Sequence, residues 1–466
     1  MKKLLLTVLL STTSLCYGMT IKFIPHEFAG FVHFLYENRD EALGSKLKAL
    51  QFEQYTFGQP TVSLSMPRSN ILEDQLFYDL SHLLAISDVD QALNNIKDEQ
   101  QRQYLLSKIQ AYYVTYQTKS HEAIDTNGYA QAANKLIKEN ANMIQGFLES
   151  ALSFYGTRAL PYDEIIVYIF PVEANKQVHK TFGFYNTILL SISDKEAIKN
   201  NLGTVMHEIA HMIYENQVAA LQYNMEKLFL HEPSQYSFHK PSQYTYIAYK
   251  YLNEALATAL GNGVFMEKLT GQPSMSYAND YIQGFAQAIY EDVKAYLYNK
   301  HTIDEAFLKK SIEQFAAAFP NATSHLEEIL SRYVILSKHF DPEKAAKTFH
   351  EYFKANSHFY AVFDDKKEIE GDMQHGSYDH NSPVVFVLSQ QEARNIHKLL
   401  KVHPYLKKLP ELRGKQLQKG FYYLRDSADR LYMFFVIDSY NDLEKLLGKL
   451  KKQTYLSAFK EGAMDL

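Results

Sequence analysis

The segment from Val205 to Ile213 constrains the fold of this chain more than any other, because it is apolar except for three residues. These three residues are His207, Glu208 and His211, and the segment contains no proline. Residues four apart lie on one face of an α-helix, one turn from each other. Burying a polar side chain without a partner costs free energy. The segment therefore predicts a buried helix whose polar side chains share a partner.

A zinc ion is the partner that suits these side chains. Two imidazole nitrogens at this spacing can converge on one Zn²⁺ at about 2.0–2.1 Å. Glu208 follows His207 directly, and from there its carboxylate can reach a water molecule bound to the metal. The pattern predicts one Zn²⁺ per chain, with His207 and His211 as ligands and Glu208 as general base.

This pattern and its apolar flanks resemble the active-site helix of the zincin metallopeptidases. In the metzincin group, a glycine and a histidine would follow His211 three and six residues later. Tyr214 and Gln217 occupy these two positions, which excludes that group. The resemblance is instead to the gluzincin group, in which a glutamate from a later helix is the third zinc ligand.

Glu254 is the candidate for this third ligand. It lies in the segment Asn253–Ala259, which resembles the Asn-Glu-x-x-Ala pattern of the gluzincins. The alanines of the segment remove bulk, so this helix could approach the first one closely. Glu254 follows His211 at a longer spacing than is usual in that group. Glu226 and Glu232 are alternative ligands at a shorter spacing, but neither lies in an alanine-rich segment.

The resemblance implies an enzyme that hydrolyses peptide bonds in a peptide or protein substrate. Two histidines and one glutamate leave the fourth zinc position open for water, whose proton Glu208 would accept. A tyrosine or histidine would help to hold the oxyanion. The sequence offers several such donors: His239, Tyr244, Tyr277, Tyr281, His375, Tyr378 and His380.

An alternative function is a catalytically inactive zincin scaffold that binds a protein or cell-envelope partner. Such a scaffold would keep zinc for stability alone, and it would have no use for a general base. The presence of Glu208 therefore favours the peptidase.

Apolar, β-branched runs predict strands before the metal-binding helix, at residues 164–170 and 186–192. In the zincin fold, the edge strand before this helix borders the substrate cleft, where an extended peptide can pair with it. Residues 186–192 are a candidate for that strand, and an ordinary internal strand is the alternative.

The rest of the chain predicts an α+β fold that is mainly helical, with helices expected within 71–152 and 311–353. Near the C-terminus we expect a strand at 383–388, a helix at 390–400, a hairpin of 421–424 with 431–437, and a helix at 438–450. Three regions are expected: an N-terminal helical region at 19–157, a zincin-like catalytic domain at 158–360 and a small C-terminal α/β domain at 361–466. The first could be a removable pro-segment or a permanent wall of the cleft.

Residues 1–18 predict a signal peptide, because two lysines precede a short apolar run and Gly18 offers a cleavage point. Cys16 is the only cysteine, so the mature chain would have neither disulfides nor cysteine ligands. Attachment of lipid to Cys16 is disfavoured by Leu15, since lipoprotein signals have a small residue there. We therefore expect an exported protein, either periplasmic or secreted.

Composition narrows the class of partner. Hydrophobic residues make up 46% and charged residues 22% of the chain, which is typical of a folded globular protein. The formal net charge of −5 gives no support for a nucleic-acid partner, which would need a basic patch. No apolar run after the signal is long enough to span a bilayer, so no stable insertion in a membrane is expected.

Overall fold

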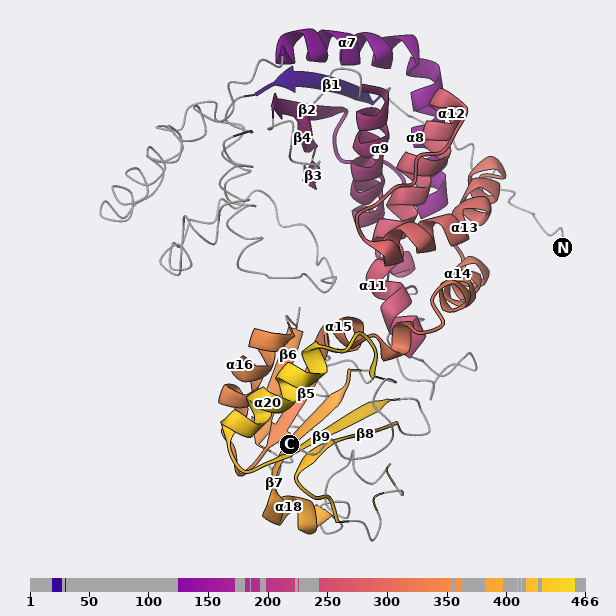
Figure 1. Ribbon diagram of the computed structural model, residues 1–466. Helices are drawn as coiled ribbons and strands as arrows, with labels where there is room; N and C mark the ends of the chain where they lie inside the picture. Colours follow the sequence, from indigo (N-terminus) through magenta and orange to yellow (C-terminus); the bar gives the residue numbers. More distant parts are fainter. Residues whose placement is uncertain are drawn as a thin grey trace, which may run out of the picture.

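The computed structural model describes residues 19–26, 30, 125–171, 181–184, 186–192, 198–222, 225, 243–353, 357–362, 382–396, 409, 412, 416–425 and 430–456. The fold is mixed α/β and mainly helical, with one mixed sheet in each of two bodies (Figure 1). The predicted mixture of helices and strands with mainly helical content is confirmed, whereas the finer α+β assignment is not, because most strand pairs in both sheets are parallel. None of the helices in the described ranges has both the length and the apolar character of a membrane span.

The first sheet has the strand order β1-β2-β4-β3. Its strands are β1 (Thr20–Pro25), β2 (Glu164–Pro171), β3 (Thr181–Phe184) and β4 (Thr187–Ile192). β1, β2 and β4 are parallel, and β3 runs antiparallel to β4. β4 is almost completely buried, as expected for an apolar strand inside a sheet. The strands predicted at 164–170 and 186–192 are confirmed.

The strand order of this sheet decides between the two alternatives for residues 186–192. β4 lies between β2 and β3, so residues 186–192 form an internal strand, and β3 is the edge strand beside it. β1 is a strand within the region 19–157 that was expected to be helical. The six residues of β1 are stabilised by β2, since Thr20 pairs with Glu164 and Pro25 with Ile169. A partner so distant in the sequence leaves no local signal.

Helices cover the first sheet and complete its core. They are α7 (Thr126–Glu139), α8 (Ala141–Tyr155), α9 (Ile198–Glu215), α11 (Gln243–Ala257), the π-helix η2 (Thr258–Phe265), α12 (Met266–Thr270), α13 (Asp280–Tyr298) and α14 (Glu305–Ala318). α7 packs on β1, whereas α8 packs on α9 and α13. One continuous hydrophobic core extends from Ile21 to Ala322, and we call the residues around it the first body.

The second sheet has the strand order β6-β5-β7-β9-β8. Its strands are β5 (Arg332–Ser337), β6 (Ser357–Val362), β7 (Val384–Ser389), β8 (Gly420–Arg425) and β9 (Leu431–Ile437). β8 and β9 form an antiparallel hairpin and the other pairs are parallel. This sheet has a hydrophobic core on each face. We call the part from Leu326 to Leu456 the second body.

Short and medium helices flank the second sheet. They are α15 (Leu326–Ile329), α16 (Pro342–Tyr352), α18 (Gln390–Arg394) and α20 (Tyr440–Lys451). The 3₁₀-helix η3 (Ala322–Ser324) precedes them and contacts α11 and α15. α16 and α20 pack against each other and against strands of the sheet. A capping box at Ser389 and Glu392 starts α18, because the two residues satisfy each other's free N–H groups.

Most predictions for the second body are confirmed. The strand at 383–388, the hairpin and the helix at 438–450 correspond to β7, β8 with β9, and α20. The helix predicted at 390–400 corresponds to α18, which ends at Arg394. Residues 397–400 lie outside the described ranges. The expectation of helix throughout 311–353 is wrong for 332–337, which form β5. A central strand buried on both faces is a continuous apolar run, and periodicity alone does not distinguish it from a helix.

The division of the chain at 157 and 360 remains a prediction. The core of the first body includes β1, α7 and α8 together with the helices that follow. Residue 360 lies inside β6, and the second core begins at Leu326.

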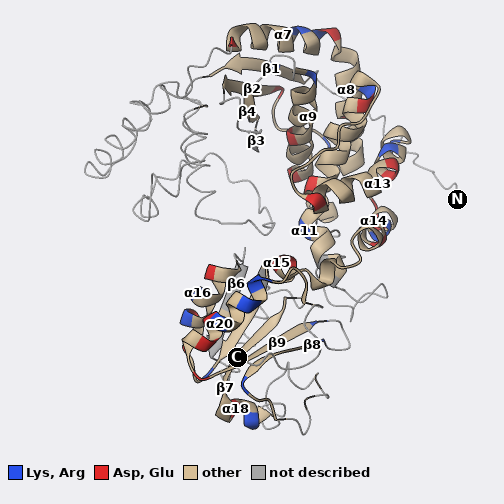
Figure 2. Ribbon diagram, viewed as in Figure 1, with Lys and Arg blue, Asp and Glu red and all other residues tan. Residues whose placement is uncertain are grey.

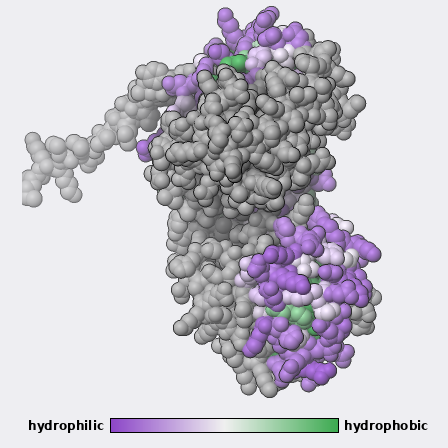
Figure 3. All heavy atoms as spheres, turned by 90° about the vertical axis from the view of Figure 1, so that its left-hand side faces the viewer, coloured by the Kyte–Doolittle hydropathy of each residue, from purple (hydrophilic) through white to green (hydrophobic). Residues whose placement is uncertain are grey.

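The described surface is polar and mixed in charge. Figure 2 shows basic and acidic residues interspersed on the helices of both bodies, and ion pairs such as Lys347 with Glu343 follow the i,i+4 spacing. Figure 3 shows one side of the molecule, where the described surface is mainly hydrophilic with small hydrophobic patches.

Candidate metal centre

The helix α9 places two histidines side by side in the first body. His207 is buried and His211 is partly buried. Their Nε2 atoms lie 3.0 Å apart, and their rings meet edge to face with centroids 4.7 Å apart. The apolar residues predicted to be buried on this helix are buried, among them Val205, Met206 and Ile209. The predicted buried helix with two convergent histidines is confirmed.

Glu254 on α11 completes a group of three. Its Oε2 atom lies 3.3 Å from Nε2 of His207 and 3.4 Å from Nε2 of His211. Ligands at about 2.0–2.2 Å from a tetrahedral zinc lie about 3.3–3.6 Å apart, close to these spacings. His207, His211 and Glu254 could therefore hold one metal ion. The alternative ligands Glu226 and Glu232 lie outside the described residues.

A glycine contact allows α9 and the chain after Glu254 to approach each other. Gly261 lies in η2, and a Cβ atom placed on it would be 2.3 Å from the backbone nitrogen of His207 and 2.8 Å from the carbonyl oxygen of Gly203. Such distances are far inside van der Waals contact, so only glycine fits at residue 261. The sequence predicts that the alanines around Glu254 allow the two helices to approach closely. These alanines are buried, but the backbone contact is made at Gly261.

The π-helix η2 directly follows α11 and faces His207. The hydroxyl of Thr258 lies 3.4 Å from Nδ1 of His207, and Asn262 also contributes a hydrogen bond to this histidine. π-helical turns are rare in proteins, and those that occur are often located at functional sites. A partner on Nδ1 fixes the orientation of the ring and leaves Nε2 for a metal.

Tyr277 is the one predicted oxyanion donor that the described structure brings to the triad. Its hydroxyl donates a hydrogen bond of 3.0 Å to Oε2 of Glu254, and its ring stacks on that of His207. The hydroxyl of Tyr281 is instead 3.1 Å from Nδ1 of His325, and Tyr244 donates to the carbonyl of Pro320. The other candidates lie outside the described residues: His239, His375, Tyr378 and His380.

Glu208 lies beside the triad and takes no part in it. Its side chain is partly buried. Burial and then the negative charges of Glu254 and Glu208 raise the pKa of Tyr277. The negative charge of Glu208 also contributes to the raised pKa of His211. The carboxylate is therefore close enough to both residues for its charge to affect them.

The charges of the triad depend on one another. Burial lowers the pKa of His207, so its ring is neutral near pH 7. Burial also disfavours a charge on His211, but the carboxylate of Glu254 outweighs it and raises the pKa of His211 to about 9. In the same way, His211 and His207 overcome burial and hold the pKa of Glu254 well below its usual value.

Zinc binding to the metal-free chain near pH 7 is expected to release about one proton, because a histidine binds a metal only in its neutral form. Only His211 is protonated there, since its pKa is about 9 and those of His207 and Glu254 are lowered. The affinity should therefore rise about tenfold per pH unit up to about pH 9 and then level off. Calorimetry in two buffers of different ionisation enthalpy counts the protons, and a count of zero would contradict the pairing of His211 with Glu254.

Comparison of the chain with protein-family models, with curated proteins and with solved structures finds no match in any of the three.

Proposed function

We propose that this chain is a zinc-dependent metallopeptidase of the gluzincin type, which hydrolyses peptide bonds in a peptide or protein substrate. The observation that carries this proposal is the convergence of Nε2 of His207, Nε2 of His211 and Oε2 of Glu254, with Glu208 on the same helix. Three protein ligands and one open position are typical of catalytic zinc, whereas structural zinc sites have four protein ligands.

The residues of the site have separate roles in this proposal. A bound Zn²⁺ would lower the pKa of water toward about 7 and polarise the scissile carbonyl. Glu208 accepts a proton from the attacking water as the new C–O bond forms, and it delivers a proton to the amide nitrogen as the C–N bond breaks. Tyr277 holds the ligand Glu254 in place, and it is the candidate donor to the developing oxyanion.

The substrate would bind along β3. This strand contacts α9 and lies at the edge of the first sheet. An extended peptide could add to the side of β3 away from β4, which pairs with none of the described strands, by backbone hydrogen bonds, and Gly183 in this strand would leave room for it. This proposal moves the expected peptide-binding strand from β4 to β3.

We also propose that the protein is exported and acts in the periplasm or outside the cell. The proposal rests on the signal-like residues 1–18, which lie outside the described residues. A mature chain without cysteine would suit an oxidising compartment, because it has no thiol that could pair wrongly.

The mature chain is expected to contain about one zinc per molecule and to cleave peptides in a mixed peptide library, as detected by mass spectrometry. Cleavage should stop when a chelator removes the metal and return when Zn²⁺ is added, since the water needs the ion for activation. His207→Ala should lose both the zinc and the activity. A chain that binds zinc but cleaves no peptide in the library would favour the non-catalytic scaffold.

A further inference from the structure

A buried carboxylate of the second body contacts the helix that carries Glu254. Glu328 on α15 is only 7% exposed. Its Oε1 atom accepts a hydrogen bond of 2.7 Å from the hydroxyl of Tyr251, and its Oε2 atom accepts one of 2.9 Å from Nζ of Lys250. Lys250 and Tyr251 are neighbours on α11, so Glu328 binds two consecutive positions of that helix.

The two contacts lie on the same side of α11 as Glu254. At about 100° per residue, the direction of Glu254 is about 40° from that of Lys250 and about 60° from that of Tyr251, and it lies between the two. Along the helix axis, Glu254 lies about one turn after Lys250 and Tyr251. A rotation of α11 that turned Glu254 away from the histidines would therefore break at least one of the bonds to Glu328.

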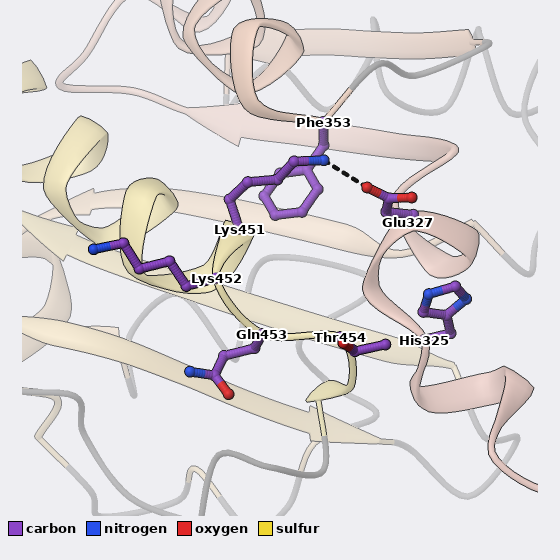
Figure 4. Close-up of a pocket in the computed structure, with 7 residues that line it drawn as sticks. All are labelled: His325, Glu327, Phe353, Lys451, Lys452, Gln453 and Thr454. Carbon is purple, nitrogen blue, oxygen red and sulfur yellow. Dashed lines mark hydrogen bonds and ion pairs between the residues drawn. The ribbon is translucent and has the colours of Figure 1, made fainter.

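The segment around Glu328 is itself fixed to the second body. We call residues 325–328 the connector, since the first hydrophobic core ends at Ala322 and the second begins at Leu326. The backbone N–H of Leu326 donates to the carbonyl of Thr454, and Glu327 pairs with Lys451 at 2.6 Å. Figure 4 shows this pair at the pocket beside the connector, where Lys451 lies over the ring of Phe353.

Tyr281 on α13 contacts both α11 and the connector, and so links the connector to the first body a second time. The ring of Tyr281 stacks on that of Tyr251 at 5.3 Å, with only 7° between the planes. Its hydroxyl meets Nδ1 of His325 at 3.1 Å. The helix α11 is thus held between α13 and the connector one turn before Glu254.

We propose that Glu328 is a positioning residue of the metal site, which holds α11 in the rotation that directs Glu254 toward His207 and His211. The proposal rests on the metal site proposed above and extends it to the second body. It implies that the second body is needed for metal binding, although it contributes none of the three ligands.

The test compares Glu328→Gln with the wild-type full-length chain. Glutamine keeps the size of the side chain but loses the charge that pairs with Lys250. The dissociation constant for Zn²⁺, measured by competition with a chromophoric chelator, should rise about tenfold, as is usual when an outer residue of a metal site is changed. A role in fold stability alone would lower the unfolding temperature of the metal-free chain and leave this constant unchanged.

Glu267→Gln is a matched control. Glu267 also accepts hydrogen bonds from one tyrosine and one lysine, Tyr290 and Lys294, each at 2.8 Å. These partners lie on α13 and not on the helix of Glu254. The zinc dissociation constant of Glu267→Gln should stay within about twofold of the wild type.

Tyr251→Phe is a milder second variant, because it removes one hydroxyl and keeps both the aromatic stacking and the pair of Lys250 with Glu328. It should weaken zinc binding less than Glu328→Gln, and the double variant should bind zinc as weakly as Glu328→Gln alone. Equal zinc affinity of the wild type, Glu328→Gln and Tyr251→Phe would overturn the positioning role while leaving the metal site intact. A wild-type chain without zinc affinity would overturn both.

Discussion

Replacing Glu208 by Gln is expected to reduce peptide hydrolysis by about 10²–10⁴-fold, while the zinc content of the chain stays the same. Glutamine has nearly the same shape as glutamate but cannot accept the proton of the attacking water. The three candidate ligands are unchanged, since Glu208 is not one of them. The measurement combines metal analysis with the rate of cleavage of a peptide found in the library.

Glu215→Gln serves as the control for this variant. Glu215 is the last residue of α9 and is exposed, so the substitution removes one negative charge from the same helix about two turns away. Its activity should equal that of the wild type. Hydrolysis that survives in Glu208→Gln would show that another group accepts the proton, and the proposed mechanism would be wrong.

Replacing Gly261 by Ala is expected to weaken zinc binding by about 100-fold or more. The added methyl group would lie 2.3 Å from the backbone nitrogen of His207. Backbone atoms cannot turn aside as a long side chain can, so α9 and η2 must move apart. A metal site tolerates changes of only about 0.2 Å in its ligand distances. The free energy of unfolding should also fall by about 1–3 kcal/mol, as is usual for an overpacked core.

Gly146→Ala is the control for Gly261→Ala, because it adds the same methyl group where there is space for it. Gly146 is an exposed residue of α8, and a Cβ atom there would meet nothing within 4 Å. Alanine is favoured over glycine in a helix by about 0.5–1 kcal/mol, so this variant should be slightly more stable and bind zinc normally. Zinc affinity of Gly261→Ala equal to that of the wild type would mean that the close approach of the backbones is not what sets the ligand spacing.

The local part of the site could be predicted from the sequence. His207 and His211 are four residues apart in an apolar segment, and helix geometry alone brings them together. A short resemblance and an alanine-rich segment indicate Glu254 as the third ligand. Both signals are contained in a few consecutive residues, and the structure places all three side chains together.

The long-range part could not be predicted in this way. Gly261 appears in the sequence as one of 19 glycines, and its importance depends on the backbone of His207 opposite. Tyr277 is one of 35 tyrosines, and only its contacts in the folded chain distinguish it from the others. The contacts of Glu328 likewise join residues of two bodies. Each of these features is a property of a pair, and no pattern along the chain marks both members.

The pairing of β1 with β2 also has a consequence for the order in which the chain can fold. β1 can join the first sheet only when β2 is present, since Thr20 pairs with Glu164, so β1 is made early and is stabilised late. Contacts between such distant residues slow folding, and an unpaired strand can meanwhile associate with other chains. A newly made molecule would therefore depend on assistance or on low local concentration until β2 has paired with β1.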